Sequence, residues 1–201
     1  RFEREARTAS SLNHPNVCTI HDIQEITGRG AVDHDDAKER HSPGRQTFIV
    51  MECVEGQTLR KIIRSAPGKM PLGAVLSIAS QIVEALVAAH EKGIVHRDIK
   101  SENIMVSSRG QVKVMDFGLA KFKGSLNLTK THSTVGTLGY MSPEQVQAGA
   151  VDHRSDQFSF GVVLFELLTG KLPFRGEHEA ALLYSIAHEP PEAVSKYRTN
   201  V

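Results

Sequence analysis

The sequence predicts an α+β fold that begins with a helix and a strand pair and continues as a mainly helical body with one embedded hairpin. Three observations predict it. Apolar residues recur at helical spacing in 1–12 and 71–93, and β-branched runs lie at 17–23 and 47–53. Two short apolar runs also flank a Ser-Ser-Arg-Gly turn at 107–110. The polar motifs fall between these elements, where functional loops are expected.

The first part of the chain is expected to fold as a helix and a strand pair. The helix covers residues 1–12, and Asn13-His14-Pro15 ends it. Strands are predicted at Val17–Ile23 and Thr47–Cys53. Residues 28–45 between them are polar and charged, with three glycines, which indicates a long mobile hairpin loop.

The middle of the chain predicts two helices and the hairpin. A short helix is expected over Leu59–Arg64, and a long one from Pro71 to Gly93. Strands Asn103–Val106 and Val112–Met115 flank the turn. The apolar face of the long helix is predicted to comprise Leu72, Val75, Leu76, Ala79, Ile82, Val83, Leu86 and Ala89.

The last third predicts an exposed segment followed by two helices. Residues 119–135 are rich in Thr, Ser, Lys and Gly, so they are expected on the surface. Asp156–Thr169 is apolar nearly all round, which indicates a helix buried inside a helical lobe. Gly170 ends it, and a final helix is expected over Glu177–His188.

Length and composition restrict the class of protein. The 201 residues suffice for one sizeable domain, and 24 basic against 23 acidic side chains give no indication of a nucleic-acid or membrane-surface binder. Cys18 and Cys53 lie in apolar runs, so we expect buried free thiols in a reducing compartment. No secretory signal is present, and no apolar run approaches membrane-spanning length. The chain starts at Arg1, inside a helical pattern, which suggests a fragment.

Two motifs carry the chemistry. The first is His96-Arg97-Asp98-Ile99-Lys100-Ser101-Glu102-Asn103, and the second is Asp116-Phe117-Gly118. Two carboxylates, a carboxamide and an ammonium group on short connections suit phosphoryl transfer, which needs oxygen ligands for Mg²⁺ and an acceptor for a hydroxyl proton. By average residue usage, the spacing His-Arg-Asp-x-x-x-x-Asn arises by chance on the order of once per thousand such chains.

These motifs resemble those of serine/threonine protein kinases, most closely the bacterial members, which often carry runs similar to residues 12–16 and 139–145. The resemblance implies a protein kinase-like fold. Residues 1–53 would form part of a β-rich N-lobe, with helix C, two strands and the insertion at about 28–45. Residues 54–201 would form a mainly helical C-lobe that lacks its last helices.

The resemblance also assigns catalytic roles. Asp98 would orient the substrate hydroxyl and accept its proton, and Lys100 would neutralise charge on the transferring phosphoryl group. Asn103 and Asp116 would bind Mg²⁺, with Mn²⁺ as an alternative metal. Thr137 would bridge Asp98 and Lys100, an arrangement typical of serine/threonine specificity.

ATP is the implied cofactor. Glu5 resembles the helix-C glutamate that pairs with a strand lysine, which this chain does not contain. Met51 would lie just before the hinge, and Glu52 and Val54 would present backbone groups to the adenine. Met105 would pack under the adenine ring, although core packing is the simpler interpretation.

Regulatory and structural residues follow from the same resemblance. Arg97 before Asp98 implies regulation by phosphorylation, with a phosphate on Thr129, Thr131 or Ser133 ordering the 119–135 segment; the choice among the three stays open. The structural set implied is His96, Phe117, Gly118, Glu144 and Asp156. Asp156 would accept hydrogen bonds from catalytic-loop amides, and Glu144 would pair with an arginine beyond the end of this chain.

The function expected of the parent protein is ATP-dependent phosphorylation of protein serine or threonine hydroxyls. A catalytically silent interaction module of the pseudokinase type, or an incomplete gene model, are the alternatives. Because the phosphate-covering glycine loop and the strand lysine are expected upstream of Arg1, the 201 residues alone are expected to have little turnover. The expected partners are a protein substrate and a kinase dimer for phosphorylation of the 119–135 segment, without nucleic acid. The region is expected in the cytoplasm, and a membrane anchor after Val201 stays open.

Overall fold

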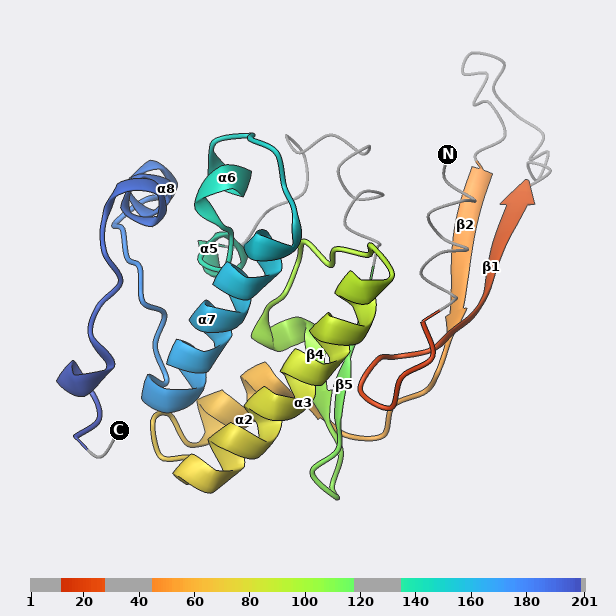
Figure 1. The fold of residues 1–201 in the computed structure, drawn as a ribbon, viewed down its shortest axis with the longest axis horizontal. Helices are drawn as coiled ribbons and strands as arrows, with labels where there is room; N and C mark the ends of the chain where they lie inside the picture. Colours follow the sequence, from red (N-terminus) through yellow and green to blue (C-terminus); the bar gives the residue numbers. More distant parts are fainter. Residues whose placement is uncertain (1–11, 28–44, 118–134, 200–201) are drawn as a thin grey trace, which may run out of the picture.

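The computed structural model describes residues 12–27, 45–117 and 135–199. The predicted helix over 1–12, apart from Leu12, therefore lies outside the described residues. The same holds for nearly all of the predicted 28–45 loop and the 119–135 segment. What is described forms two small antiparallel sheets and a helical body, a mixed α+β arrangement as predicted (Figure 1).

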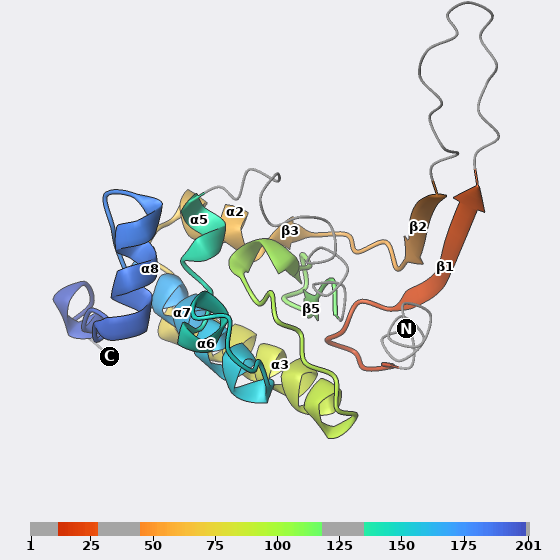
Figure 2. The same ribbon diagram turned by 90° about the horizontal axis from the view of Figure 1, so that it is seen from above.

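The strand pair forms a two-stranded ribbon at one side of the helical body (Figures 1 and 2). Strand β1 (Ile20–Thr27) pairs with β2 (Arg45–Met51), from Ile20 opposite Met51 to Thr27 opposite Arg45. The predicted start at Val17 is wrong by three residues. Val17 instead forms an isolated parallel bridge with Val114, so the chain pairs with the end of another strand, Val112–Val114, before β1 begins.

The ribbon also corrects the prediction for the cysteines. Cys18 and Cys53 are both free thiols, but only Cys18 is buried, whereas Cys53, just after β2, is exposed. Phe48 and Val50 of β2 are 48% and 44% exposed. A two-stranded ribbon has two open faces, and an apolar run on it is therefore not evidence of burial.

The second sheet has the strand order β3-β4-β5 and contains the predicted hairpin. Strand β3 (Gln57–Thr58) pairs with β4 (Ile104–Val106), which pairs with β5 (Val112–Val114). Alternate residues of β4 and β5 are buried, as a half-covered sheet requires. The short 3-10 turn η1 (Ser101–Asn103) leads directly into β4, so this sheet positions the end of the first motif.

Helix α2 (Leu59–Ser65) and helix α3 (Leu72–Glu91) match the predicted helices closely. Pro71 precedes the first helical residue of α3 as its cap. The predicted apolar face was partly wrong, since Leu72, Leu76 and Val83 are exposed while Ile78 and Ala85 are buried. The buried stripe is rotated because α3 packs against both α7 and β5.

Among the described residues, α3 is also the one helix long and apolar enough to cross a membrane by length and composition. This differs from the expectation that no apolar run of the chain approaches membrane-spanning length. Seven of its residues are buried against the rest of the body, which is the pattern of a core helix in a folded domain.

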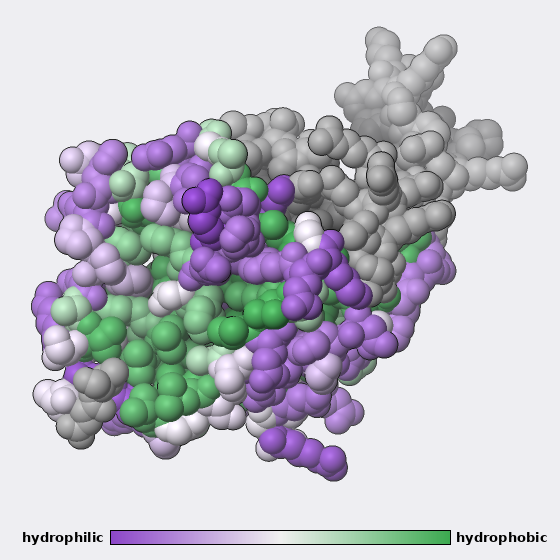
Figure 3. Space-filling model, in the orientation of Figure 1, coloured by the Kyte–Doolittle hydropathy of each residue, from purple (hydrophilic) through white to green (hydrophobic). Residues whose placement is uncertain are grey.

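Helix α7 (His153–Thr169) is the centre of the helical body. Its outer side borders a hollow of about 390 Å³, which includes Phe158, Phe165 and Phe174, and Figure 3 shows a broad apolar area on this face of the molecule. Gly170 ends the helix in the left-handed conformation, as predicted from its position.

The remaining helical segments are short. They are α5 (Val135–Leu138), α6 (Pro143–Val146), α8 (Glu179–His188) and the 3-10 turn η2 (Val194–Lys196). Helix α6 packs against both α7 and α8, and α5 packs against α8 (Figure 1). They carry the chain between the second motif and α7, close to the loop that holds Asp98.

Candidate active site

The loop between α3 and η1 brings the polar residues of the first motif together. The Lys100 ammonium group donates to both carboxylate oxygens of Asp98 at 2.9 Å. The Asn103 amide donates to the Asp98 backbone carbonyl at 2.8 Å and to its carboxylate at 3.1 Å. The Asp98 side chain is 23% exposed, so it is held in place and yet reachable from solvent.

The second motif lies beside this loop because β5 pairs with β4, which follows directly after η1. The Met115 amide donates to the Asn103 carbonyl at 2.8 Å, so Asp116 follows directly after a residue bonded to the first motif. Asp116 itself has a positive φ of 61°, a conformation that L residues seldom adopt. Asp98, Asn103 and Asp116 are therefore supplied to one region by a loop, a 3-10 turn and a strand end.

The donor set fits a hard divalent cation. Within residues 12–27, 45–117 and 135–199, no group of three or more His, Cys, Asp and Glu side chains is arranged to hold a metal ion. Mg²⁺ is, however, usually bound through one or two protein oxygens together with substrate phosphates. Because the amide nitrogen of Asn103 already donates to Asp98, its carbonyl oxygen is the atom left for a cation.

His96 is a buried structural link between the two motifs. Its Nε2 donates to the Met115 carbonyl at 2.7 Å, and its Nδ1 accepts from the Asp98 amide at 3.2 Å. One nitrogen donates and the other accepts, so the ring is neutral. Burial lowers the pKa of His96, which agrees with that state. The ring also packs edge-on against the buried Phe117, 4.6 Å between centroids.

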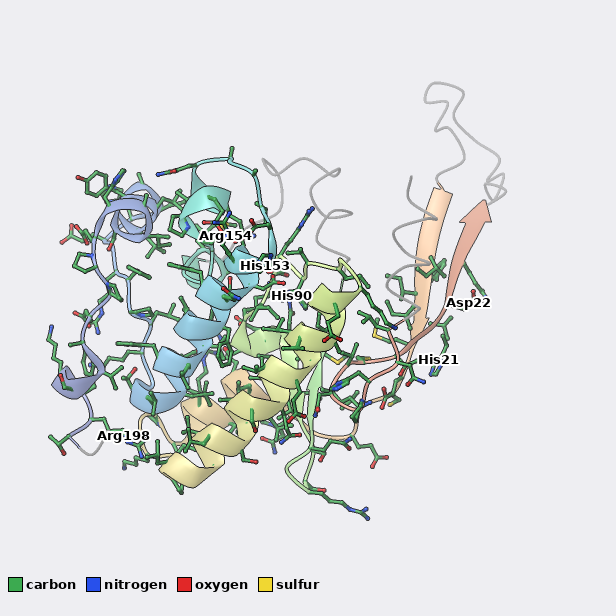
Figure 4. The ribbon with its side chains drawn as sticks, in the orientation of Figure 1. His21, Asp22, His90, His153, Arg154 and Arg198 are labelled. Atoms are coloured by element: carbon green, nitrogen blue, oxygen red, sulfur yellow. The ribbon has the colours of Figure 1, made fainter. Side chains whose placement is uncertain are left out.

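Asp156 anchors the same loop from α7. Its fully buried carboxylate accepts from the backbone amides of His96 at 2.8 Å and Arg97 at 2.7 Å. His90, in the last turn of α3, lies 2.8 Å away through Nε2 and supplies a third hydrogen bond. Figure 4 shows His90 beside His153, whose ring meets it edge-on where α3 and α7 come together.

Arg97 combines two unusual features. Its φ is 69°, and its Nε is buried without a hydrogen-bond partner among the described residues. The candidate phosphorylation sites Thr129, Thr131 and Ser133 lie outside the described residues, as do Glu5 and Gly118, so their predicted roles stay predictions.

The expected nucleotide side of the site is formed by the end of β2 and by β4. Met51, Glu52, Val54 and Met105 are all partly exposed. The Glu52 amide donates to the Thr19 carbonyl at 2.8 Å, and Lys113 donates to the Glu52 carboxylate at 2.8 Å. Partial burial raises the pKa of Glu52, but the hydrogen bonds from Lys113 and Thr19 outweigh it, so the net pKa is lowered. The predicted adenine contacts stay predictions.

Thr137 and Glu144 lie in the short helices before α7. The Thr137 carbonyl accepts from the Tyr140 amide at 3.5 Å; its predicted hydroxyl bridge to Asp98 and Lys100 stays a prediction. Glu144 accepts a short hydrogen bond from the Ser155 hydroxyl. Burial alone would raise the pKa of Glu144, but the hydrogen bond from Ser155 outweighs burial, so the net pKa is lowered.

Sequence reasoning missed a buried polar chain that ties the first motif to α7. The Tyr140 hydroxyl donates to Glu166 at 2.5 Å, and the hydroxyl oxygens of Tyr140 and Ser101 are hydrogen-bonded at 2.8 Å. Burial raises the pKa of both Glu166 and Tyr140. A charged residue in the apolar run of α7 was the one signal available, since a buried carboxylate requires partners.

Gln145 was also missed. Its side chain closes a capping box with Ser142 at the start of α6 and donates to the Arg97 carbonyl at 2.7 Å. A glutamine three residues after a serine predicts the capping box, but nothing in the sequence predicts the second contact.

The family model described as "Protein kinase domain" matches residues 1–200. The chain is 42% identical over 200 residues to the serine/threonine-protein kinase PrkC of Bacillus subtilis (strain 168). It is 41% identical over 192 residues to the serine/threonine-protein kinase PknB of Mycobacterium leprae (strain TN).

These matches cover 100% and 95% of this chain, but the chain spans 28% and 29% of the length of the two relatives. PknB of Mycobacterium tuberculosis (strain ATCC 25618 / H37Rv) is similar to the same extent, with 40% identity over 194 residues. The similarity therefore applies to one part of much longer proteins.

Proposed function

The chain belongs to the protein kinase family, and from this membership we propose that the full-length protein transfers the γ-phosphoryl group of ATP to serine or threonine hydroxyls of proteins. The observation that carries the proposal is the held carboxylate of Asp98, which Lys100 contacts through both oxygens and Asn103 through one. Such a group is fixed in direction and still acts as an acceptor.

In the proposed reaction, the substrate hydroxyl oxygen attacks the γ-phosphorus of ATP while the bond from that phosphorus to the β-phosphate oxygen breaks. The products are a phosphoester and ADP, and the hydroxyl proton passes to the Asp98 carboxylate. Lys100 is within reach of the same region and offsets negative charge that spreads over the phosphoryl oxygens. Catalysis would come almost entirely from positioning and electrostatics.

Divalent metal and ATP are required by this family, and we propose Mg²⁺ as the metal, with Asn103 and Asp116 as its protein ligands. When bound, the cation neutralises charge on the ATP phosphates. The protein's own contribution is to hold the two oxygen donors in place. The hydrogen bonds from Asn103 to Asp98 and from Met115 to Asn103 provide that support.

Arg97 supports a proposal of regulation by phosphorylation. Its buried Nε has an unused donor among the described residues, and a guanidinium is well suited to a phosphate. A phosphate on Thr129, Thr131 or Ser133 would supply the acceptor. We also propose that phosphorylation of residues 119–135 takes place between two copies of the kinase.

We place the reaction in the cytoplasm, where ATP is available.

The test is phosphate transfer from radiolabelled ATP to a generic serine/threonine substrate by the full-length protein. Asp98→Asn keeps the size of the side chain but removes the proton acceptor, so kcat should fall by about 10²- to 10⁴-fold. Asp22→Asn makes the same change at an exposed residue of β1 and should stay within twofold of wild type.

Equal transfer by the wild type and Asp98→Asn would remove Asp98 from its proposed role. A wild-type protein that binds ATP without any transfer would favour the silent interaction module instead.

A further inference from the structure

The residue directly before Asp98 adopts a backbone conformation that its side chain disfavours. Arg97 has a φ of 69°, in the left-handed region where a Cβ atom crowds the following carbonyl oxygen. A conformation of this kind persists only where the surroundings hold it. The groups that hold the Arg97 backbone therefore also determine the direction of the Asp98 side chain.

Both peptide groups of Arg97 are held by side chains from outside the loop. The Arg97 amide donates to Asp156 on α7, and the Arg97 carbonyl accepts from Nε2 of Gln145 on α6, each at 2.7 Å. The loop is therefore held by two residues on helices that lie 48 and 59 positions further along the chain.

The Gln145 contact acts on the peptide that leads into Asp98. That peptide carries the Arg97 carbonyl and the Asp98 amide, and the Asp98 amide donates to Nδ1 of His96 at 3.2 Å. Its plane is thus fixed at both ends, by Gln145 at the oxygen and by His96 at the nitrogen. Any rotation of this plane would turn the Asp98 side chain away from Lys100 and Asn103.

The orientation of the Gln145 amide is itself determined. Its Oε1 accepts from the Ser142 amide at 2.9 Å, and its own backbone amide donates to the Ser142 hydroxyl at 3.4 Å. With Oε1 used as an acceptor, only the NH₂ group can face the Arg97 carbonyl. The capping box therefore has two effects: it caps α6, and it directs the NH₂ group of Gln145 toward the loop.

We propose that Gln145 is a positioning residue for phosphoryl transfer, which couples the place of α6 to the direction of the Asp98 carboxylate. The proposal rests on the proposed function and adds a residue that positions the Asp98 carboxylate for it. A displacement of α6 would therefore reach Asp98 through Gln145 and the Arg97 carbonyl.

The test compares Gln145→Glu and Gln145→Met with wild type in the full-length protein. Glutamate keeps the acceptor for Ser142 but places an oxygen against the Arg97 carbonyl. Methionine keeps the length without polarity or charge. Both should lower kcat by about tenfold and leave the KM for ATP within twofold, because the contact acts on Asp98 and involves none of the residues proposed to contact ATP or its metal.

A matched control removes a buried hydrogen bond elsewhere in the same body. Thr169→Ala deletes a hydroxyl that donates to the Phe165 carbonyl at 2.8 Å, at the far end of α7. It should lower the melting temperature at least as much as the Gln145 variants while leaving kcat within twofold of wild type. A kcat loss of the same size in this control would mean general destabilisation and would overturn the proposal.

A second readout does not depend on turnover. Amide hydrogen exchange in residues 94–103 should be about tenfold faster in both Gln145 variants and unchanged in Thr169→Ala. Unchanged exchange, a kcat within twofold of wild type, or a kcat loss confined to the glutamate variant would each overturn the proposal. If the wild type transfers no phosphate, the proposed function fails and the exchange result alone decides whether Gln145 holds the loop.

Discussion

At the scale of single residues, the site contains two left-handed residues that are not glycine. Arg97 and Asp116 have φ values of 69° and 61°, and each such conformation costs about 1–3 kcal/mol. Each lies in one of the two motifs, and Arg97 directly precedes Asp98. The sequence identified both residues but not their conformation, because the pattern around an Arg or Asp carries no signal for positive φ, as a glycine would.

His96 leads to a prediction for the pH dependence of stability. Its pKa is lowered by burial, so below about pH 6.5 the unfolded chain binds a proton that the folded chain does not. The stability due to neutral His96 is present above about pH 6.5 and is lost as the pH falls toward the lowered pKa. Hydrogen exchange of residues 94–103 should therefore quicken between pH 7.5 and 5.5, after correction for intrinsic exchange rates.

The control is His96→Asn, which removes the titrating group. This variant should be less stable than wild type at pH 7.5, yet its stability should change less between the two pH values. An equal pH dependence in both proteins would mean that another group causes it.

At the scale of elements, helix ends were predictable and helix faces less so. Gly170 ends α7, as the sequence indicated, and α3 begins one residue after the predicted start at Pro71. The buried face of α3 was partly wrong, with Leu76 59% exposed. Ends depend on local backbone chemistry, whereas a helix that is apolar on several sides buries whichever side its neighbours reach.

Gly170 gives the prediction at this scale. It has a φ of 71°, and a Cβ there would lie 2.6 Å from the Pro67 side chain and 2.9 Å from the Gly68 amide nitrogen. Gly170→Ala should therefore cost the left-handed penalty of about 1–2 kcal/mol and a steric penalty of about 1–3 kcal/mol in addition. Hydrogen exchange in the last turns of α7 measures the loss.

Gly110→Ala is the matched control, since Gly110 also has a positive φ of 79° but nothing lies within 4 Å of the added atom. It should show the left-handed penalty alone. Similar losses in the two variants would show that contact with Pro67 and Gly68 relaxes at little cost.

At the scale of the whole molecule, a partly buried amide network connects the segment before β1 to the helical body. Gln81 of α3 accepts from Asn16 and from the Val112 amide, both at 2.9 Å, and donates to the Gly110 carbonyl at 3.0 Å. Asn16 also donates to the Val112 carbonyl. One glutamine therefore joins α3, the β4–β5 hairpin and the segment that leads to β1.

Gln81→Leu should loosen this junction. The substitution leaves the Asn16 and Val112 donors without their partner, at a cost of about 1–3 kcal/mol. Exchange should quicken in residues 12–19 and 110–114, while that in α7 changes little. Gln157→Leu, at an exposed position of α7, is the control and should stay within about 0.5 kcal/mol of wild type. Equal effects of the two variants would contradict the role of Gln81.

The sequence by itself determined the fold class, most helix and strand bounds to within a few residues, and both motifs of the candidate site. These features depend on local pattern, capping and turn chemistry, which a short stretch of chain contains in full. It also indicated the family, because the residues that do the chemistry are consecutive or closely spaced.

Only the tertiary structure decided which groups hold those residues in place. The contacts of Asp156 and Gln145 with Arg97, of Glu166 with Tyr140, and of Gln81 with Asn16 join residues 26 to 65 positions apart. Each depends on how helices and loops pack, and many polar side chains with similar local surroundings point to solvent instead. The residues that carry the chemistry can therefore be predicted from the motifs, whereas the position of their side chains depends on long-range packing.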